Sequence, residues 1–297
     1  MSVSVLLNLG QTALELGLTY SLTVLALFLS YSMLNVCDLS TDGCFTLGAA
    51  VGAMVALAGH PYLSIPVAML AGAASGFVTA ILQTRMGVDS LLSGIIVMTG
   101  LYSVNLHVAG RANVQLFSFD TMFKNSFISA LPAAVQPYAP VVILALLTLV
   151  VKLLMDAYLA TRSGFLLRAT GDNPTLVASL AKDSGKVKIL GLSIANALVS
   201  LAGCVMCQYQ RYFDISMGTG TLVLAVASVI VGTQLVRGMR FLGATLAVIL
   251  GSILYKGCVA LALSLGLSPF DLKLITAVLL LVIIVLGGHK RKVKPRA

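Results

Sequence analysis

Charged residues are scarce in this sequence. Only 10% of the 297 residues are Asp, Glu, Lys or Arg, whereas 59% are hydrophobic and the mean hydropathy is +1.02. Soluble domains carry about 25% charged residues, so this chain cannot cover itself with a surface compatible with water. The composition therefore excludes an ordinary soluble domain and predicts a membrane protein.

Motifs of catalysis and of cofactor binding are missing as well. The sequence has no G-x-x-x-x-G-K-[S/T] phosphate loop, so we expect no ATP hydrolysis by this chain itself. It has no nucleophile elbow centred on a serine, and His60, His107 and His289 lack metal-ligand spacing. Cys204 and Cys207 form a C-x-x-C inside an apolar run, where small residues pack between helices. We expect no enzyme activity, cofactor or metal in this chain.

Long apolar runs fill most of the sequence. The hydrocarbon core of a bilayer needs about 20 apolar residues per helix. The resulting prediction is an all-α polytopic membrane protein with 8–10 transmembrane helices, built as a single transmembrane domain over 1–297. The N-terminus lacks the basic region of a cleavable signal, so its first apolar run is expected to remain as a span. Nine spans are predicted, near 12–34, 44–60, 62–83, 89–108, 138–159, 188–209, 218–235, 241–264 and 272–288.

Basic residues are distributed unevenly, although the net charge is +9. No Lys or Arg precedes Arg85, and most later ones fall within 162–188, at 237 and 240, or in the tail at 290–296. With nine spans these places all lie on one side, as the positive-inside rule requires of the cytoplasm. The charge therefore indicates topology and no nucleic-acid partner. It places the N-terminus and the loop 109–137 outside, and the loop 160–187 inside.

A weak internal repeat is visible. Asp38–Ser40 and Asp214–Ser216 both have the form Asp-x-Ser before an apolar run, 176 residues apart, and Leu63–Gly72 resembles Leu242–Gly251. Five predicted spans separate the copies, so they enter the membrane from opposite sides. That arrangement is an inverted repeat, a common construction for transporters, and chance similarity between apolar segments is the alternative. The repeat halves would cover roughly 36–110 and 212–288.

The segment 161–188 predicts a short amphipathic helix on the cytoplasmic side. Asn173 suits the N-cap, Pro174 the first helical position and Gly185 the stop. Such a helix either lies on lipid or docks in the groove of a partner, and the narrow apolar face favours a protein partner. Gly171 and Asp172 would shape the turn that aims this helix, next to the basic Arg168. Its apolar stripe consists of Leu176, Val177 and Leu180.

The two Asp-x-Ser segments are candidates for a translocation path. Broken backbone at membrane depth survives only where it lines a cavity or is buried in protein. Ordinary aspartates that cap the following helix are the alternative. The candidate residues are Asp38, Ser40, Asp42, Asp214 and Ser216.

Other polar residues fall within the predicted spans. Asn105, Gln208 and Gln210 are also candidates for the path, although hydrogen bonding between helices is the more common role of such residues. Glu15, the only Glu in the chain, and Lys256 lie in spans, where ionisable groups are costly and often functional. The two could instead neutralise each other or a neighbour.

Four segments in order along the chain resemble the branched-chain amino acid/ribose type of ABC permease, and within it the tryptophan/tyrosine-type permeases. They are Asp38–Val51, Leu167–Lys182, Asn196–Gly232 and Gly251–Thr276.

The resemblance implies a type II ABC importer-like permease in the bacterial inner membrane. It implies a second permease copy, separate ATP-binding subunits that hold ATP and Mg, and an extracytoplasmic substrate-binding protein that is either lipid-anchored or periplasmic. It also places Leu167–Lys182 on the coupling loop that contacts the ATPase. Arg211 and Gln234 depart from the family pattern and put the substrate in doubt.

An aromatic amino acid is the leading substrate, and another small polar metabolite is the alternative. An ion-coupled secondary transporter that uses Glu15 or an Asp is the alternative function, whereas a membrane enzyme is disfavoured because no catalytic cluster is present.

Overall fold

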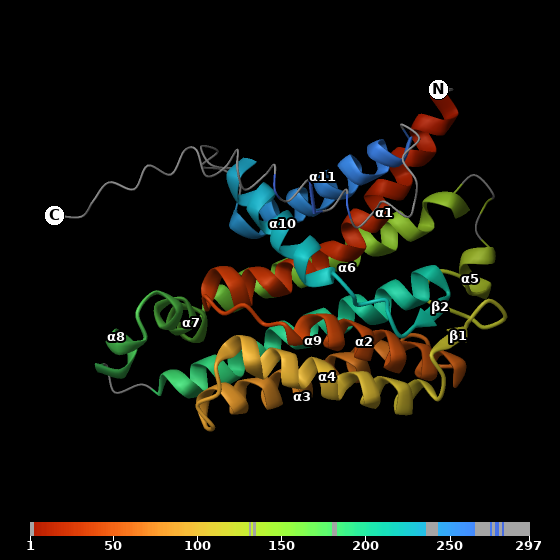
Figure 1. Cartoon of the computed structure of the whole chain (residues 1–297). Helices are drawn as coiled ribbons and strands as arrows, with labels where there is room; N and C mark the ends of the chain where they lie inside the picture. The colour runs from red at the N-terminus through yellow and green to blue at the C-terminus, as the bar shows by residue number, and fades with distance from the viewer. Residues whose placement is uncertain are drawn as a thin grey trace.

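The computed structural model describes residues 3–130, 132, 135–179, 183–235 and 243–264, together with 274, 277, 278 and 281. Helices make up most of this part (Figure 1). The helices are α1 (Val3–Leu27), continued by a π-helical turn (Phe28–Met33), α2 (Ser40–Leu57), α3 (Ser64–Thr84), α4 (Ser90–Ala109), α5 (Ser126–Ser129), α6 (Ala139–Leu159), α7 (Arg162–Asp172), α8 (Pro174–Ser179), α9 (Ser184–Gln210), α10 (Thr221–Leu235) and α11 (Ala244–Ser264).

Seven helices in the described part are long and apolar enough to cross a membrane, and a shorter apolar helix covers Thr221–Gln234. These eight coincide with the first eight predicted spans. The ninth predicted span, 272–288, lies almost entirely outside the described residues. The long apolar helices are Leu9–Met33, Ser40–Leu57, Ser64–Thr84, Ser90–Ala109, Gln136–Leu159, Ser184–Gln210 and Ala244–Ala262.

Helix α9 lies at the centre of the bundle, packed along its length against α2 and α3. A Cβ added at Gly48 would overlap the carbonyl oxygen of Ser200, and one at Gly72 would overlap that of Asn196. Glycine at these positions lets the helix backbones touch, which is how membrane helices associate without a hydrophobic driving force. The centre of α9, from Gly191 to Gln208, is consequently almost entirely buried.

Two long helices end in the same unusual way. Asn35, just after the π-helical turn, and Arg211, just after α9, both adopt left-handed backbone, with φ of 54° and 63°. Each lies at the start of a non-helical segment, residues 34–39 in the first case and 211–220 in the second. The two left-handed residues are separated by the same 176 positions as the two Asp-x-Ser segments.

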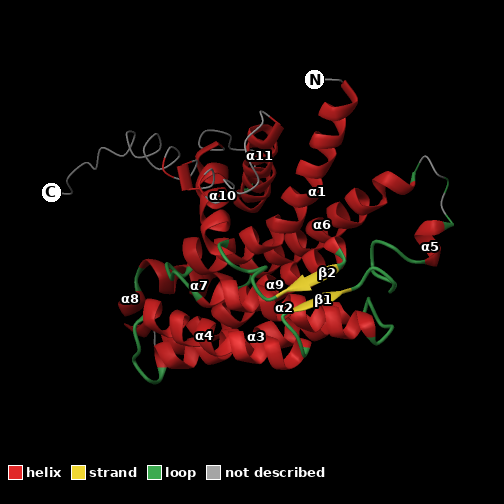
Figure 2. Cartoon of the chain, turned by 45° about the vertical axis from the view of Figure 1, so that its right-hand side comes forward, coloured by secondary structure: helices red, strands yellow, loops and turns green. Residues whose placement is uncertain are grey.

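A two-stranded antiparallel sheet closes one end of the bundle. Strand β1 (Asn113–Gln115) pairs with β2 (Tyr212–Asp214), with Val114 opposite Phe213 (Figure 2). Phe213 is fully buried, so the sheet anchors the connection after α4 to the end of α9. Figure 1 shows α5, β1 and β2 at this end and α7 and α8 at the opposite end, which is the predicted cytoplasmic end.

Candidate translocation and coupling sites

Asp38 is buried where α2 begins beside the middle of α9. Its Oδ1 accepts a hydrogen bond from the Ser40 amide (2.9 Å), and its Oδ2 accepts one from Asn196 Nδ2 (2.8 Å). The Ser40 hydroxyl also accepts from Asn196 (3.3 Å) and from Thr79 (3.3 Å), so the cluster joins α2, α3 and α9. Asn196 lies about 18 Å along α9 from its start, at about 1.5 Å per residue, which is near the middle of a bilayer. The first Asp-x-Ser segment therefore starts α2 at membrane depth.

We expect Asn196→Leu to lower the free energy of unfolding by about 2 kcal/mol, because it leaves the buried Asp38 carboxylate without its side-chain donor. Thermal unfolding of the purified chain in detergent measures this. Asn113→Leu is the matched control, since Asn113 makes one long, exposed bond to Asp214 (3.4 Å) and its loss should cost under about 0.5 kcal/mol. Equal losses in the two variants would contradict the role given to Asn196.

Asp42 links the start of α2 to the second non-helical segment and to the start of α10. Its Oδ2 accepts from the Gly220 amide (2.8 Å), and its Oδ1 accepts from the Leu222 amide (2.8 Å) and the Thr221 hydroxyl (2.9 Å). A carboxylate at a helix N-terminus satisfies unpaired amides and interacts favourably with the helix dipole. Asp42, in the first turn of α2, thus caps α10 from a position some 180 residues earlier in the chain. The start of α10 depends on a residue of the other predicted repeat half.

Asp214 forms the same local turn as Asp38 but in an exposed setting. Its Oδ1 accepts from the Ser216 amide (2.8 Å) and from the Ser216 hydroxyl. The hydroxyl bond is the main reason that the pKa of this carboxyl lies below its usual range, so the group stays ionised at neutral pH. Asp214 and Ser216 line a cavity of about 370 Å³ together with Gln210. The other lining residues are Tyr20, Met206, Tyr212 and Met217.

Gln208 has its hydrogen-bonding capacity used within the protein. Its Oε1 accepts from the Met122 amide (3.0 Å), and its Nε2 donates to the Ser64 hydroxyl (2.6 Å) and the Pro61 carbonyl (3.1 Å). The side chain is fully buried. This geometry favours the packing role considered for it and shows no group left to face a solute.

Asn105 differs from Gln208. Its Nδ2 donates to the Gly43 carbonyl (3.1 Å), whereas its buried Oδ1 has no hydrogen-bond partner. It lines a cavity of about 310 Å³ with Asp42, Thr46 and Thr219. Of the eight predicted path residues, Asp38, Ser40 and Gln208 lie in buried networks, while the other five line one of the two cavities.

Glu15 and Lys256 do not form an ion pair with each other. Glu15 accepts from Gln11 Nε2 (3.0 Å) and from the Tyr209 hydroxyl (2.5 Å). The Lys256 ammonium lies 3.7 Å from the centroid of the Tyr20 ring. Each therefore has its own neighbours, and the mutual neutralisation considered from the sequence is not what the structure shows.

The predicted coupling segment forms two helices where the sequence predicted one helix after a turn. Gly171 and Asp172 close the last turn of α7, so they do not form the predicted turn. Asn173 is extended and stands before Pro174, as expected of an N-cap followed by the first helical residue. Helix α8 is described as far as Ser179, and residues 180–182 lie outside the described part. Gly185 lies in the first turn of α9, whose N-cap is Asp183, and not at a helix stop. Local residue preferences correctly predicted where α8 starts, but they did not predict that α7 continues to Asp172.

The predicted apolar stripe is only partly described. Val177 is fully buried within the chain, so its side chain packs inward and offers no surface to a partner. The side chains of Leu176 and Leu180 lie outside the described residues.

Helix α7 contacts the end of the first membrane helix directly. A Cβ added at Gly171 would overlap the Met33 carbonyl oxygen, and Arg168 Nε lies 3.3 Å from Met33 Sδ. Beside this contact is a cavity of about 730 Å³ that reaches from Asn35 to the start of α9. The loop between α6 and α9 therefore touches the segment that carries Asp38.

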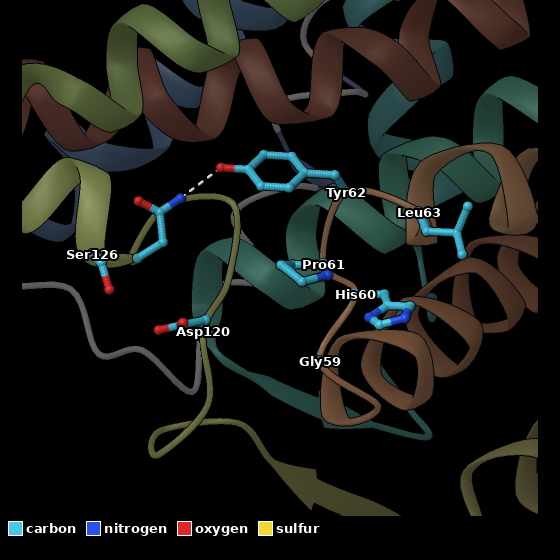
Figure 3. Close-up of a pocket in the computed structure, with 8 residues that line it drawn as sticks. Gly59, His60, Pro61, Tyr62, Leu63, Asp120 and Ser126 are labelled. Carbon is cyan, nitrogen blue, oxygen red and sulfur yellow. Dashed lines mark hydrogen bonds between the residues drawn. The ribbon is translucent and has the colours of Figure 1, made fainter.

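Another cavity, which the sequence gave no reason to expect, lies at the opposite end of the bundle. It measures about 530 Å³ and is lined by the turn between α2 and α3 and by the segment before α5 (Figure 3). Asn125 Nδ2 donates to the Tyr62 hydroxyl (2.6 Å) across it, and Asp120 lies nearby. In the sequence, only the position of the aromatic Tyr62 before an apolar run could have pointed to it.

A family model for the permease component of branched-chain amino acid transport systems matches residues 11–286. The chain belongs to this permease family. Its members are transmembrane components of ABC import systems, which work with separate ATPase and binding-protein partners and do not themselves catalyse a reaction. The resemblance seen in the sequence is thereby confirmed, as is a multi-pass membrane location.

Relatives within this family differ in their substrates. Over 273 residues the permease is 37% identical to a tyrosine transport system permease protein of Clostridioides difficile. The aligned region covers 92% of this chain and 89% of the relative. It is 24% identical to the ribose import permease protein RbsC of Escherichia coli, over 86% of this chain and 78% of the relative.

The fold matches a solved structure over nearly its whole length. PsaBC from Streptococcus pneumoniae aligns with a TM-score of 0.53 at 12% identity, over 97% of this chain and 93% of that chain. At this identity the likeness concerns the fold alone, and it supports the type II ABC permease-like fold expected from the sequence.

Proposed function

We propose that this permease and a second copy form the membrane pathway of an ABC importer for an amino acid. ATP-binding subunits dock at the loop 160–187, and an extracytoplasmic binding protein delivers the substrate at the opposite end. The observation that carries the proposal is the Asp42 contact, by which one half of the permease caps a helix of the other half.

The broken helices support an inverted repeat, with halves 36–110 and 212–288. A left-handed residue directly precedes each half, and an Asp-x-Ser turn follows near its start, in which the serine amide donates to the aspartate at 2.9 Å and 2.8 Å. Transporters with such repeats place their substrate where the broken segments meet and alternate access by moving one half against the other. In this permease the second of these segments meets the first turn of α2 at Asp42.

The contact of α7 with the end of α1 is the route by which movement of the ATPase reaches the membrane helices. A rigid displacement of α7 by an attached ATPase would move Met33 and Leu34, because Gly171 packs against both. Segment 34–39 leads directly to Asp38 and to the start of α2. Movement at the cytoplasmic end is thus transmitted to the middle of the membrane through close backbone contacts, which resist deformation because packed interiors are dense.

An amino acid is the substrate class that the relatives and the cavities favour. The tyrosine permease of Clostridioides difficile covers almost the whole chain, and the cavity at Asp214 carries two tyrosines and two methionines.

The test is uptake of radiolabelled tyrosine into proteoliposomes that contain the permease with its ATPase subunits and binding protein. We expect uptake that requires ATP and is unaffected by collapse of ion gradients. Uptake by the permease alone, driven by a proton or sodium gradient, would establish the ion-coupled alternative and overturn the proposal.

Docking of the ATPase is tested by Leu176→Asp combined with Leu180→Asp, which should prevent co-purification of the ATPase subunits. Val135→Asp is the control, because Val135 is exposed at the opposite end of the bundle. If the double variant retains the ATPase, α8 is not the docking element.

A further inference from the structure

The cavity beside the contact between α7 and the end of α1 lies at the predicted cytoplasmic end of the bundle (Figure 1). Its wall is formed by the end of α3, the starts of α4 and α9, the end of α7 and the non-helical segment after α1. Its volume of about 730 Å³ lies within the range typical of small-ligand sites, about 300–1,000 Å³. The cavity is therefore large enough for a small organic ligand.

Two charges of opposite sign line this cavity. Lys188 lies in the second turn of α9, and Asp172 is the last residue of α7. Within the described residues neither forms an ion pair, although the charge of Asp89 attracts Lys188. Asp183 also lines the cavity, but it caps α9 by accepting from two amides of that helix (2.9 and 3.2 Å). The cavity thus offers one ammonium and one carboxylate that the described residues leave unpaired.

Leu34 connects the two helices that carry these charges. A Cβ added at Gly171, next to Asp172, would lie 2.9 Å from the Leu34 backbone, and one at Gly191 would lie 2.6 Å from the Leu34 side chain. Residues three apart on a helix share a face, so Lys188 lies on the face of α9 that carries Gly191. Asp172 and Lys188 therefore both lie beside Leu34, which lines the same cavity.

The surroundings of the two charges favour different ligand groups. The hydroxyls of Ser184, one turn before Lys188 on α9, and of Ser90, at the start of α4, line the cavity and have no partner among the described residues. Two hydroxyl donors and an ammonium suit a carboxylate. Asp172 ends α7, where the helix dipole is negative, so its charge is unfavourable there until a cation neutralises it. A ligand that carries both a carboxylate and an ammonium satisfies both ends.

We propose that this cavity is a feedback site on the cytoplasmic side that binds a free amino acid, with Lys188 and the two serine hydroxyls holding its carboxylate and Asp172 its ammonium. The site rests on the proposed importer function, because its ligand is the imported substrate after release into the cytoplasm. Bound there, the amino acid ties the end of α7 to the starts of α4 and α9. Because α7 has to move with the ATPase, the ligand slows uptake when the amino acid accumulates inside.

Binding is measured with radiolabelled L-tyrosine on the purified full chain in detergent. Tyramine lacks the carboxylate, and 3-(4-hydroxyphenyl)propionate lacks the ammonium. Each should compete at least about tenfold more weakly than unlabelled L-tyrosine, because each leaves one charge of the site unpaired. Equal competition by the three compounds would overturn the site.

The variants assign each end of the ligand. Lys188→Met should weaken L-tyrosine and the propionate about tenfold or more without affecting tyramine, since it removes a charged donor, and Lys188→Arg should restore most of the affinity. Asp172→Asn should weaken L-tyrosine and tyramine without affecting the propionate. Lys186→Met is the matched control, because Lys186 is an exposed lysine of the same helix that pairs with Asp183 (4.0 Å) and does not line the cavity.

Size-exclusion chromatography and circular dichroism establish that the variants fold. Affinities unchanged by both Lys188→Met and Asp172→Asn would overturn the site. Native mass spectrometry provides a second measurement: phosphatidylethanolamine, which also carries an anion and an ammonium, retained by the wild-type chain in place of the amino acid would assign the cavity to a lipid headgroup and overturn the proposal.

Feedback is measured in proteoliposomes that contain the complete complex. Unlabelled L-tyrosine trapped inside should lower the initial rate of ATP-driven uptake at least about fivefold, the lower end of common allosteric couplings. Lys188→Met should remove this inhibition, with each complex compared with its own rate without internal tyrosine. Inhibition of equal depth in the wild type and in Lys188→Met would contradict the proposal. A complex that imports tyrosine but is not inhibited from inside would refute the feedback site alone and leave the importer function standing.

Discussion

Replacing Asp42 by Ala is expected to lower the free energy of unfolding by about 3 kcal/mol and to abolish uptake. The substitution removes acceptors for two amides and one hydroxyl at the start of α10, and hydrogen bonds to charged groups contribute about 1.5–3 kcal/mol each when no water replaces them. Water can replace part of this, so the expected loss lies below the sum. Thermal unfolding in detergent and ATP-driven uptake measure the two effects.

Asp89→Ala is the matched control for Asp42→Ala. Asp89 is also an N-cap aspartate, but it is exposed and accepts from Leu91 of its own helix (2.9 Å). Its loss should cost about 1 kcal/mol, the usual value for a helix cap, and leave uptake nearly intact. Asp42→Asn retains one acceptor and should fall between the two. Similar behaviour of Asp42→Ala and Asp89→Ala would show that the contact between the halves is an ordinary cap.

Gly171→Ala is expected to uncouple the transporter: ATP hydrolysis by the complex continues while uptake falls at least about tenfold. The added methyl would overlap the Met33 carbonyl oxygen, so α7 would have to move away from the end of α1. Small displacements of this kind, remote from the reacting groups, cost about a hundredfold in some enzymes. Parallel assays of ATPase activity and uptake in proteoliposomes measure the effect.

Gly100→Ala supplies the control for this substitution. Gly100 lies in α4, and a Cβ added there meets no atom within 4 Å. Glycine to alanine in an open helical position stabilises a helix by about 0.5–1 kcal/mol, so this variant should transport normally. If Gly171→Ala transports as well as Gly100→Ala, the contact with Met33 does not transmit movement.

The membrane helices could be predicted because each is encoded by a continuous apolar run. The breaks before α2 and α10 were also visible locally, since aspartate, serine and glycine precede both runs. The bonds between Asp42 and residues 220–222 could not be predicted, because they join segments about 180 residues apart and local propensity contains no information about that pairing.

In the coupling loop, local sequence patterns predicted the surroundings of two residues incorrectly. Val177 has the spacing of an exposed apolar stripe, yet it is buried, because helical spacing shows that residues share a face and not which neighbour that face meets. Gly171 suits a turn by its composition, but it lies within α7, where its lack of a side chain permits contact with Met33. In both cases, contacts with other parts of the fold determine the surroundings of the residue.

The most direct test of the account is whether nucleotide at the cytoplasmic end changes access to the cavity that Asp214 and Ser216 line. A single cysteine is placed at Ser216 in a Cys37→Ser, Cys258→Ser background, because Cys44, Cys204 and Cys207 are buried. Its labelling by a membrane-impermeant maleimide is compared in the complete complex with and without trapped ATP. We predict a clear change in labelling rate that disappears in Gly171→Ala; equal rates with and without nucleotide in the parent complex would contradict the account.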